Sequence, residues 1–251
     1  MAGKLEGKIA VITGGNSGIG LATAKRFVNE GARVVITGRR QTELDKAVQE
    51  IGSSKATGVQ GDVARLQDLD RLYDTIKSKY GHIDILFANA GLGNVVPFGQ
   101  VTEENFDHQF NVNVKGLFFT VQKALPLMKD GGSIILNASI AASKGMQGMS
   151  VYSATKAAVR SFARSWTADL KERKIRVNAI SPGPIATPIF GKMGLNEEQQ
   201  QQFGTSIVSQ VPMGRIGNSD EIASALLFLA SSDSSYVTGI ELTVDGGLAQ
   251  V

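Results

Sequence analysis

The sequence predicts a doubly wound α/β fold, in which a seven-stranded parallel sheet carries helices on both faces. Short apolar runs rich in β-branched residues alternate with helical patterns along the whole chain, which is the arrangement of parallel α/β proteins. The runs are apolar throughout, as in strands that are buried on both faces. With 251 residues and 42% hydrophobic composition, the chain can form one core, and we expect a single domain spanning residues 1–251.

The first predicted strand covers residues 8–13 and leads directly into a glycine-rich turn. The turn reads Gly14-Gly-Asn-Ser-Gly18-Ile-Gly20, and a helical pattern follows. Glycines allow positive φ angles and close approach of a ligand, while a helix start offers unpaired N–H groups and a positive dipole end. The spacing differs from the G-x-G-x-x-G fingerprint. Strand, turn and helix together still predict a dinucleotide site contacted by Gly14, Asn16, Ser17, Gly18, Ile19 and Gly20.

The second predicted strand, 33–37, ends in Gly38-Arg39-Arg40. In dinucleotide enzymes of this architecture, an acidic residue about 20 positions beyond the glycine turn binds the ribose 2′-hydroxyl, whereas an arginine accepts a 2′-phosphate. Here Gly38 stands where the acid would be, and Arg39 follows it. We therefore expect NADP(H) as the cofactor. The alternative is that both arginines are solvated turn residues.

Two further strands, 56–60 and 83–88, end in turns with polar or small residues. Gly61-Asp62-Val63 follows the first strand and Asn89-Ala90-Gly91 follows the second. The small residues of the second turn let the backbone pass close to a ribose or an adenine. An ordinary strand-ending turn is the alternative, and Asp62 could instead cap the next helix.

The fifth predicted strand, 132–138, is followed by the residues of a candidate acid–base site. Ser139 comes directly after the strand, and Tyr152 and Lys156 lie four residues apart on the next helix. Positions i and i+4 share a helix face, so the phenol and the ammonium can point into one cleft. A nearby cation lowers the pKa of a phenol, and the serine hydroxyl can hold a substrate oxygen beside it. A surface pair and a turn-forming serine are the alternatives.

The remaining elements are predicted from caps and apolar runs. Helices begin at Thr102 and at Asn218, where Glu221 completes a capping box. Strands are expected at 175–180 and 240–244. The irregular stretch at about 184–212 is too long for an ordinary loop, so we expect a substrate lid there, with a disordered insertion as the alternative.

In this order the motifs resemble those of the short-chain dehydrogenase/reductase family. The matching positions cover nearly the whole chain and are Thr13-Gly14-x-x-x-Gly18-x-Gly20, Asn89-Ala90-Gly91, Asn113, Ser139, Tyr152-x-x-x-Lys156 and Pro182-Gly183-x-x-x-Thr187. The resemblance implies a Rossmann fold with strand order 3-2-1-4-5-6-7. The chain is most similar to the bacterial broad-range NADPH-dependent secondary-alcohol dehydrogenases, through segments such as Leu86-Phe-Ala-Asn-Ala-Gly91 and Ser234-Ser-Tyr-Val-Thr-Gly239.

The resemblance also implies individual roles. Asn113, rather than its neighbour Asn111, would kink its helix and hold a water that links Lys156 to solvent. Lys156 would bind the nicotinamide ribose and Thr187 the carboxamide. The other cofactor contacts implied are Asp62 and Val63 at the adenine, and Pro182, Gly183 and Ile185. The family further implies a homotetramer built through the helices near 103–127 and 151–172.

The substrate is expected to be an apolar, bulky ketone or its secondary alcohol. The apolar residues that could reach it are Val95, Val96, Phe98, Met146, Met149, Ile189, Phe190 and Met193. The chief alternative is a 3-oxoacyl-thioester reductase of fatty-acid synthesis, but those enzymes usually carry Asn before the tyrosine and Gln two residues earlier, where this chain has Val151 and Met149. A non-catalytic NADP-binding scaffold or regulator would have no reason to keep the tetrad Asn113, Ser139, Tyr152 and Lys156 together.

Composition argues against several other classes. The net charge of +3 is spread along the chain, so nucleic-acid binding is not expected. No run approaches the roughly 20 apolar residues of a membrane helix, and the first residues lack the apolar core of a signal peptide. The absence of cysteine is compatible with a cytoplasmic location. The two histidines have no partner at metal-binding spacing, so no metal is expected.

Overall fold

Seven parallel strands form one continuous sheet in the order β3-β2-β1-β4-β5-β6-β9. The structure is a computed structural model that describes residues 3–187 and 206–251. The strands are β1 (Ile9–Ile12), β2 (Arg33–Gly38), β3 (Ala56–Gln60), β4 (Ile83–Ala88), β5 (Met128–Asn137), β6 (Arg176–Pro182) and β9 (Glu241–Val244). The predicted doubly wound sheet and its strand order are therefore confirmed. A second, two-stranded sheet pairs β7 (Ile185–Ala186) with β8 (Gly217–Asn218), which the sequence did not predict.

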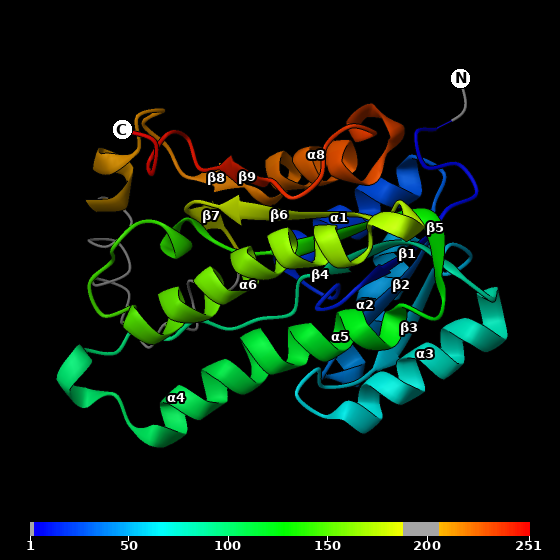
Figure 1. The fold of residues 1–251 in the computed structure, drawn as a ribbon, viewed down its shortest axis with the longest axis horizontal. Coiled ribbons are helices and arrows are strands. Elements are labelled where there is room, and N and C mark those ends of the chain that lie inside the picture. Colours follow the sequence, from blue (N-terminus) through cyan, green and yellow to red (C-terminus); the bar gives the residue numbers. More distant parts are fainter. Residues whose placement is uncertain (1–2, 188–205) are drawn as a thin grey trace.

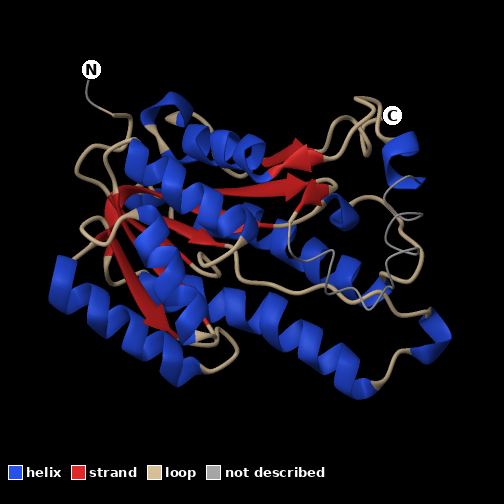
Figure 2. Ribbon diagram, turned by 180° about the vertical axis from the view of Figure 1, so that it is seen from behind, coloured by secondary structure: helices blue, strands red, loops and turns tan. Residues whose placement is uncertain are grey.

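Helices cover both faces of the sheet (Figures 1 and 2). The helices are α1 (Gly18–Asn29), α2 (Gln41–Ile51), α3 (Leu66–Tyr80), α4 (Glu103–Phe110), α5 (Leu117–Ala124), α6 (Ser150–Asp169) and α8 (Ser219–Ala230). Helices α3, α5 and α6 pack on one face, and α1, α2 and α8 on the other. Successive residues of a strand point to opposite faces of the sheet. Val11 and Val35 therefore pack in the core under α3, α5 and α6, and Ile12 and Ile36 pack in the core under α1, α2 and α8.

Two predicted helix starts are confirmed by their caps. The Thr102 hydroxyl accepts a hydrogen bond from the backbone N–H of Asn105, 3.2 Å away, at the start of α4. At the start of α8, Asn218 and Glu221 exchange hydrogen bonds with each other's backbone N–H groups at 3.0 and 2.9 Å. These caps satisfy donors that the first helical turn cannot pair itself.

Strand β5 begins earlier than the predicted residue 132. Met128 already pairs with Ile83 of β4, and the register then shifts before Ser133 pairs with Ile85. The intervening residues bulge outward, and Gly131 adopts a φ of +76°, a conformation that favours glycine. Because the bulge carries Lys129-Asp130-Gly131-Gly132, the sequence reads there as a turn rather than as a strand.

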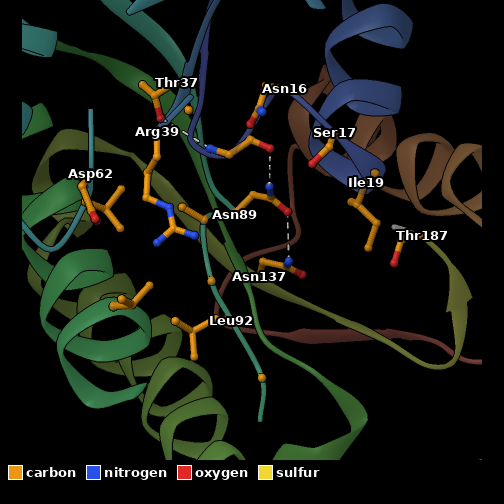
Figure 3. Close-up of a pocket in the computed structure, with 18 of the residues that line it drawn as sticks. Asn16, Ser17, Ile19, Thr37, Arg39, Asp62, Asn89, Leu92, Asn137 and Thr187 are labelled. Carbon is orange, nitrogen blue, oxygen red and sulfur yellow. Dashed lines mark hydrogen bonds between the residues drawn. The ribbon is translucent and has the colours of Figure 1, made fainter. Parts of the chain in front are cut away.

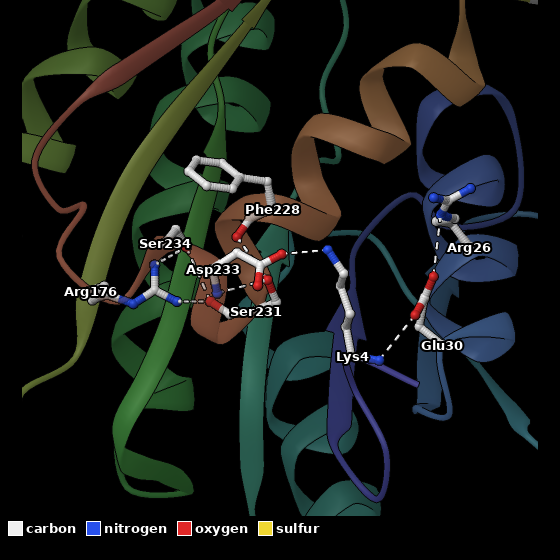
Figure 4. A network of polar contacts seen from close by, with 8 residues as sticks. All are labelled: Lys4, Arg26, Glu30, Arg176, Phe228, Ser231, Asp233 and Ser234. Atoms are coloured by element: carbon white, nitrogen blue, oxygen red, sulfur yellow. Dashed lines mark hydrogen bonds and ion pairs between the residues drawn. The ribbon is translucent and has the colours of Figure 1, made fainter. Parts of the chain in front are cut away.

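A polar network ties the N-terminal segment and α8 to the edge of the sheet where the strands begin (Figure 4). Arg176, the first residue of β6, donates to the carbonyl oxygens of Leu229 and Ser231 at 2.9 and 3.2 Å, and to the Ser234 hydroxyl at 2.8 Å. Lys4 pairs with Asp233 across the same edge. These contacts cap the last carbonyls of α8, and they leave the opposite edge, at the carboxyl ends of the strands, for the cavity described next.

Most of the expected lid, residues 188–205 of about 184–212, lies outside the described residues. The segments on either side of it are anchored to the fold. Gly183 donates its N–H to the Val244 carbonyl at 3.0 Å, and Met213 donates its N–H to the Gly246 carbonyl at 3.2 Å. The expected lid therefore starts and ends beside the C-terminal segment that follows β9.

Candidate active site

A cavity of about 360 Å³ opens at the carboxyl ends of the central strands (Figure 3). Ligands of open α/β sheets bind at this edge. Fourteen residues predicted to bind cofactor line it: Gly14, Asn16, Ser17, Gly18, Ile19, Arg39, Asp62, Val63, Asn89, Ala90, Gly91, Tyr152, Lys156 and Thr187. The sequence patterns after β1, β2, β3, β4 and β6 and on α6 thus meet in one place.

The glycine-rich turn forms one wall of the cavity and leads into α1. Gly14 and Gly18 adopt φ angles of +65° and +52°, which explains glycine at these two positions. Ser17 is the N-cap residue of α1, and its hydroxyl makes no capping hydrogen bond. Backbone N–H groups at a helix start, together with the Ser17 hydroxyl, suit an anionic ligand such as a pyrophosphate.

The Asn89 turn is cross-linked to the end of β1. The backbone N–H groups of Asn89 and Ala90 both donate to the Thr13 hydroxyl at 3.0 Å. The Asn89 side-chain Nδ2 donates to the carbonyl oxygens of Thr13 and Gly14 at 2.9 and 3.3 Å. The second turn therefore holds the first in place, and the side chain of Asn89 is engaged in building the site.

Arg39 extends into the cavity from the end of β2, on the side of Asp62 and across from Thr187 (Figure 3). Its side chain is exposed, and within residues 3–187 and 206–251 it makes no ion pair. Asp62 lines the same side, and its Oδ1 accepts from the Ala64 N–H at 3.0 Å. Asp62 thus shapes its turn but does not cap α3, whose N-cap residue is Arg65.

Tyr152 and Lys156 share one face of α6, as their spacing predicts. The Lys156 Nζ lies 5.6 Å from the centre of the Tyr152 ring and donates to the Asn137 carbonyl oxygen at 2.6 Å. Ser139 follows β5, and its hydroxyl accepts from the Ala141 N–H at 3.2 Å and is hydrogen-bonded to Tyr152. A hydroxyl, a phenol and an ammonium therefore converge at one end of the cavity.

The expected effect of Lys156 on the phenol is corrected by the structure. Burial raises the pKa of Tyr152, and the hydrogen bond with Ser139 opposes this rise in part. Burial also lowers the pKa of Lys156 to about 8. The Lys156 ammonium donates to the Asn137 carbonyl oxygen, and desolvation is the largest effect on the pKa of each of the two groups.

Asn113 is buried behind the cavity wall and does not line it. Its Oδ1 accepts from the Leu92 N–H at 2.9 Å, and its Nδ2 donates to the Leu92 carbonyl at 2.8 Å and to the Thr155 hydroxyl at 3.1 Å. It lies in a π-helical stretch, Asn111–Gly116, between α4 and α5, and such stretches distort helices. Asn111 is exposed, which agrees with the choice of Asn113.

Four residues predicted as cofactor contacts, Gly20, Pro182, Gly183 and Ile185, are not among those that line the cavity, and their contact with a cofactor stays a prediction. A Cβ at Gly20 would sit 2.4 Å from the Gly14 carbonyl oxygen, so Gly20 permits close packing under the turn. Pro182 and Gly183 lie against β9 and Asp245, and Ile185 is buried in the core beside α8. Ser139 also lies outside the lining and reaches the site through Tyr152.

Several lining residues were missed by the sequence analysis. They are Thr37, Gly38, Arg40, Gly61, Leu92, Gly93, Asn94, Val112 and Asn137. Most of them flank predicted residues, so extending each motif by one or two positions would have found them. Asn137 also lies two positions from a predicted residue, Ser139, but it ended an apolar run and gave no local signal of its own.

The residues expected to surround the substrate are only partly described. Val95, Val96, Phe98, Met146 and Met149 lie outside the cavity lining, while Ile189, Phe190 and Met193 lie outside the described residues. The Val96 N–H donates to the Gly148 carbonyl at 2.8 Å, so the two described segments lie together. Gly93, three residues before Val96, lies against the Tyr152 ring. The segment that carries Val95 and Val96 therefore follows directly on a residue in contact with the Tyr152 ring.

Two further observations concern ions and membranes. His82 Nε2 lies 3.2 Å from the Asp84 carboxylate, a pairing that the spacing of the histidines did not suggest. Across the part of the chain that the structure describes, no group of three His, Asp or Glu side chains could hold a metal ion, and no helix combines the length and hydrophobicity of a membrane span.

Comparisons with known proteins find relatives over nearly the whole chain. A family model described as Enoyl-(Acyl carrier protein) reductase matches residues 14–249. The oxidoreductase asL5 of Sarocladium schorii is 49% identical over 99% of this chain and 98% of the relative. The NADP-dependent (R)-specific alcohol dehydrogenase of Lentilactobacillus kefiri is 37% identical over 98% of both chains.

Solved structures from Brucella melitensis share the whole fold. A short-chain dehydrogenase/reductase described as a glucose/ribitol dehydrogenase matches with a TM-score of 0.92, at 32% identity over 99% of each chain. A 3-ketoacyl-(acyl-carrier-protein) reductase complexed with NADH matches with a TM-score of 0.90, at 35% identity over 98% of this chain and 99% of the other. The relatives thus include both kinds of enzyme considered from the sequence.

Proposed function

The chain belongs to the short-chain dehydrogenase/reductase family of oxidoreductases, and from this premise we propose that it transfers a hydride between NADP(H) and an apolar ketone or the corresponding secondary alcohol. The observation that carries the proposal is one cavity that combines an acid–base group with an arginine after β2. Tyr152, which interacts with Ser139, and Lys156 line this cavity together with Arg39.

The cavity suits a nicotinamide cofactor on two grounds. The glycine-rich turn leaves room for a ligand to approach the backbone at the start of α1, where a pyrophosphate is favoured. The side-chain Oδ1 of Asn137 is buried in the cavity wall without a hydrogen-bond partner among the described residues, so a bound molecule can supply one. When bound there, the nicotinamide supplies or takes up the hydride.

Tyr152 is the proposed proton donor and acceptor. In the reducing direction its hydroxyl gives a proton to the substrate carbonyl oxygen, which becomes the alcohol oxygen. Burial raises the pKa of the phenol, so the hydroxyl is protonated at neutral pH, and transfer of its proton depends on stabilisation of the phenolate that forms. The Ser139 hydroxyl can hold the same substrate oxygen, and the Lys156 ammonium stabilises the phenolate left behind.

NADP(H) is proposed over NAD(H) because of the end of β2. Gly38 carries no side chain, and a Cβ there would lie 2.7 Å from the Asn16 Oδ1. An aspartate at this position could not fit unless Asn16 moved. Arg39 follows with an exposed guanidinium that can bind a 2′-phosphate by donating hydrogen bonds to it.

An apolar substrate is proposed because apolar side chains are exposed on the segment after Gly93. Val95 and Phe98 are 44% and 85% exposed, and a Cβ at Gly148 would lie 2.9 Å from the Val95 side chain. Exposed apolar side chains on the segment that follows Gly93, which lies against the Tyr152 ring, favour substrates that gain from desolvation. Thioester reduction remains the second candidate, because one structural relative is a 3-ketoacyl-(acyl-carrier-protein) reductase.

A substrate panel tests the proposal. Initial rates of NADPH oxidation would be measured with small ketones, aryl ketones, long-chain ketones and 3-oxoacyl thioesters. Aryl or long-chain ketones should give the highest kcat/KM. A thioester that exceeds every ketone by about tenfold or more, a difference of about 1.4 kcal/mol, would favour the second candidate. Inactivity with all substrates, together with tight NADPH binding, would favour a non-catalytic nucleotide-binding protein.

A further inference from the structure

Asn137, the last residue of β5, connects parts of the site that come from distant parts of the sequence. Its Nδ2 donates to the Asn89 Oδ1 at 3.0 Å. Its backbone carbonyl oxygen accepts from the Lys156 Nζ at 2.6 Å. The residue therefore joins the turn after β4 to the proposed catalytic lysine of α6, and it lines the cavity between them (Figure 3).

The orientation of the Asn137 amide follows from its neighbours. The Asn89 Nδ2 donates to two backbone carbonyl oxygens, those of Thr13 and Gly14, which can only accept. The Asn89 oxygen must then face Asn137. Because that oxygen needs a donor, Asn137 presents its Nδ2 to it, and the Oδ1 of Asn137 is left facing elsewhere.

This remaining oxygen is buried and has no hydrogen-bond partner among residues 3–187 and 206–251. An unpaired buried acceptor destabilises a fold by about 1–3 kcal/mol. Lys156, a neighbouring donor, is directed to the backbone carbonyl of Asn137. The sheet core does not need an amide here, since the preceding residues Ile134, Ile135 and Leu136 are apolar and buried. A ligand that brings an N–H or O–H donor accounts for the amide.

We propose that Asn137 is a cofactor-binding and positioning residue: its Oδ1 accepts a hydrogen bond from the nicotinamide half of the cofactor, and its amide holds the Asn89 turn in register with Lys156. The inference rests on the proposed function. The nicotinamide half is the relevant half because Asn137 contacts Lys156, which shares a helix face with the proposed proton donor Tyr152, and the proton and the hydride must reach the same carbonyl group. That half offers ribose hydroxyls and a carboxamide NH₂ as donors.

The test compares Asn137→Leu with a matched variant, Asn178→Leu. Leucine is close in size to asparagine and keeps the backbone carbonyl that Lys156 uses. Asn178 lies on the neighbouring strand β6, is fully buried, and bonds through its side chain to the Val237 carbonyl at 2.9 Å and the Ile240 N–H at 3.2 Å. The Asn178→Leu variant therefore shows how much stability and cofactor affinity change when a buried amide is lost from the sheet outside the cavity.

Dissociation constants would be measured by fluorescence titration for NADPH, for its analogue without nicotinamide (2′-phospho-ADP-ribose), and for 2′,5′-ADP. Asn137→Leu should weaken NADPH about tenfold, as expected for one hydrogen bond to a buried acceptor, and change 2′,5′-ADP less than about threefold. Loss with both larger ligands identifies a ribose hydroxyl as the donor, and loss with NADPH alone identifies the carboxamide. Asn178→Leu should lower the melting temperature and leave all three constants unchanged.

A second variant tests the positioning role through the pH dependence of unfolding, which a simple loss of packing would leave unchanged. Asn137→Asp places a carboxylate beside the Lys156 ammonium, which should move the pH dependence of unfolding that belongs to Lys156 to higher pH. An unmoved pH dependence, unchanged NADPH affinity in Asn137→Leu, or an equal loss of 2′,5′-ADP affinity would each overturn the inference. Failure of the wild-type protein to bind NADPH would instead overturn the proposed function.

Discussion

Replacing Lys156 by methionine should abolish turnover and also change how stability depends on pH. Lys156 is 4% exposed, and burial lowers its pKa from 10.5 to about 8. One pKa unit corresponds to about 1.4 kcal/mol, so keeping this ammonium charged in the folded protein costs about 3 kcal/mol near neutral pH. Methionine has a similar length and no charge, so the variant does not have the free-energy cost of a buried ammonium.

The sign follows from proton binding. Between about pH 8 and pH 10.5 the unfolded chain holds a proton on Lys156 that the folded protein has released, so the penalty is complete below about pH 8 and fades as the pH rises. The lost hydrogen bond to Asn137 also destabilises the variant, so the change with pH is the informative quantity. From about pH 6.5 to pH 9.5, wild type should gain about 2 kcal/mol relative to Lys156→Met.

Urea unfolding at the two pH values measures this difference, because the other titrating groups are shared by both proteins. Lys55→Met replaces an exposed lysine and should follow wild type at both values. A Lys156→Met difference that stays constant with pH would refute the claim that burial destabilises the ammonium in the folded state.

Three further predictions concern the cofactor and the assembly. Arg39→Ala should weaken NADPH binding about 10- to 100-fold and spare NADH in fluorescence titrations; equal losses would make the arginine structural. Gly20→Ala should weaken both cofactors alike in calorimetric titrations, because its Cβ would lie 2.4 Å from the Gly14 carbonyl oxygen and displace the turn; unchanged binding would contradict that packing. Light scattering at micromolar concentration should give the mass of a homotetramer, and a monomeric mass would be against it.

The parts of the fold that the sequence predicted well are those with a local pattern. Strand β4 matches its predicted bounds, because Ile83-Asp-Ile-Leu-Phe87 is apolar and ends at a turn of small residues. The capping box at Asn218 and Glu221 likewise depends on residues three positions apart. The fixed spacing of Tyr152 and Lys156 was enough to place both on one helix face.

The features that sequence reasoning missed depend on contacts between distant residues. Asn137 matters because it touches Asn89, 48 positions away, and Lys156, 19 positions away. The pKa of Tyr152 depends on its burial in the assembled fold, which the helix spacing does not report. Gly20 belongs to the glycine motif of the family. Only the folded structure shows that it packs against the Gly14 carbonyl oxygen under the turn.

The most direct test of the account is the kcat of Tyr152→Phe with NADPH and an aryl ketone, measured beside its NADPH dissociation constant. The substitution removes one hydroxyl and keeps the ring that packs against Gly93. If this hydroxyl is the proton donor, kcat should fall by about 10²–10⁴ while the dissociation constant stays near that of wild type. A variant that retains more than about a tenth of the wild-type kcat would contradict the assignment of Tyr152 as the acid and base.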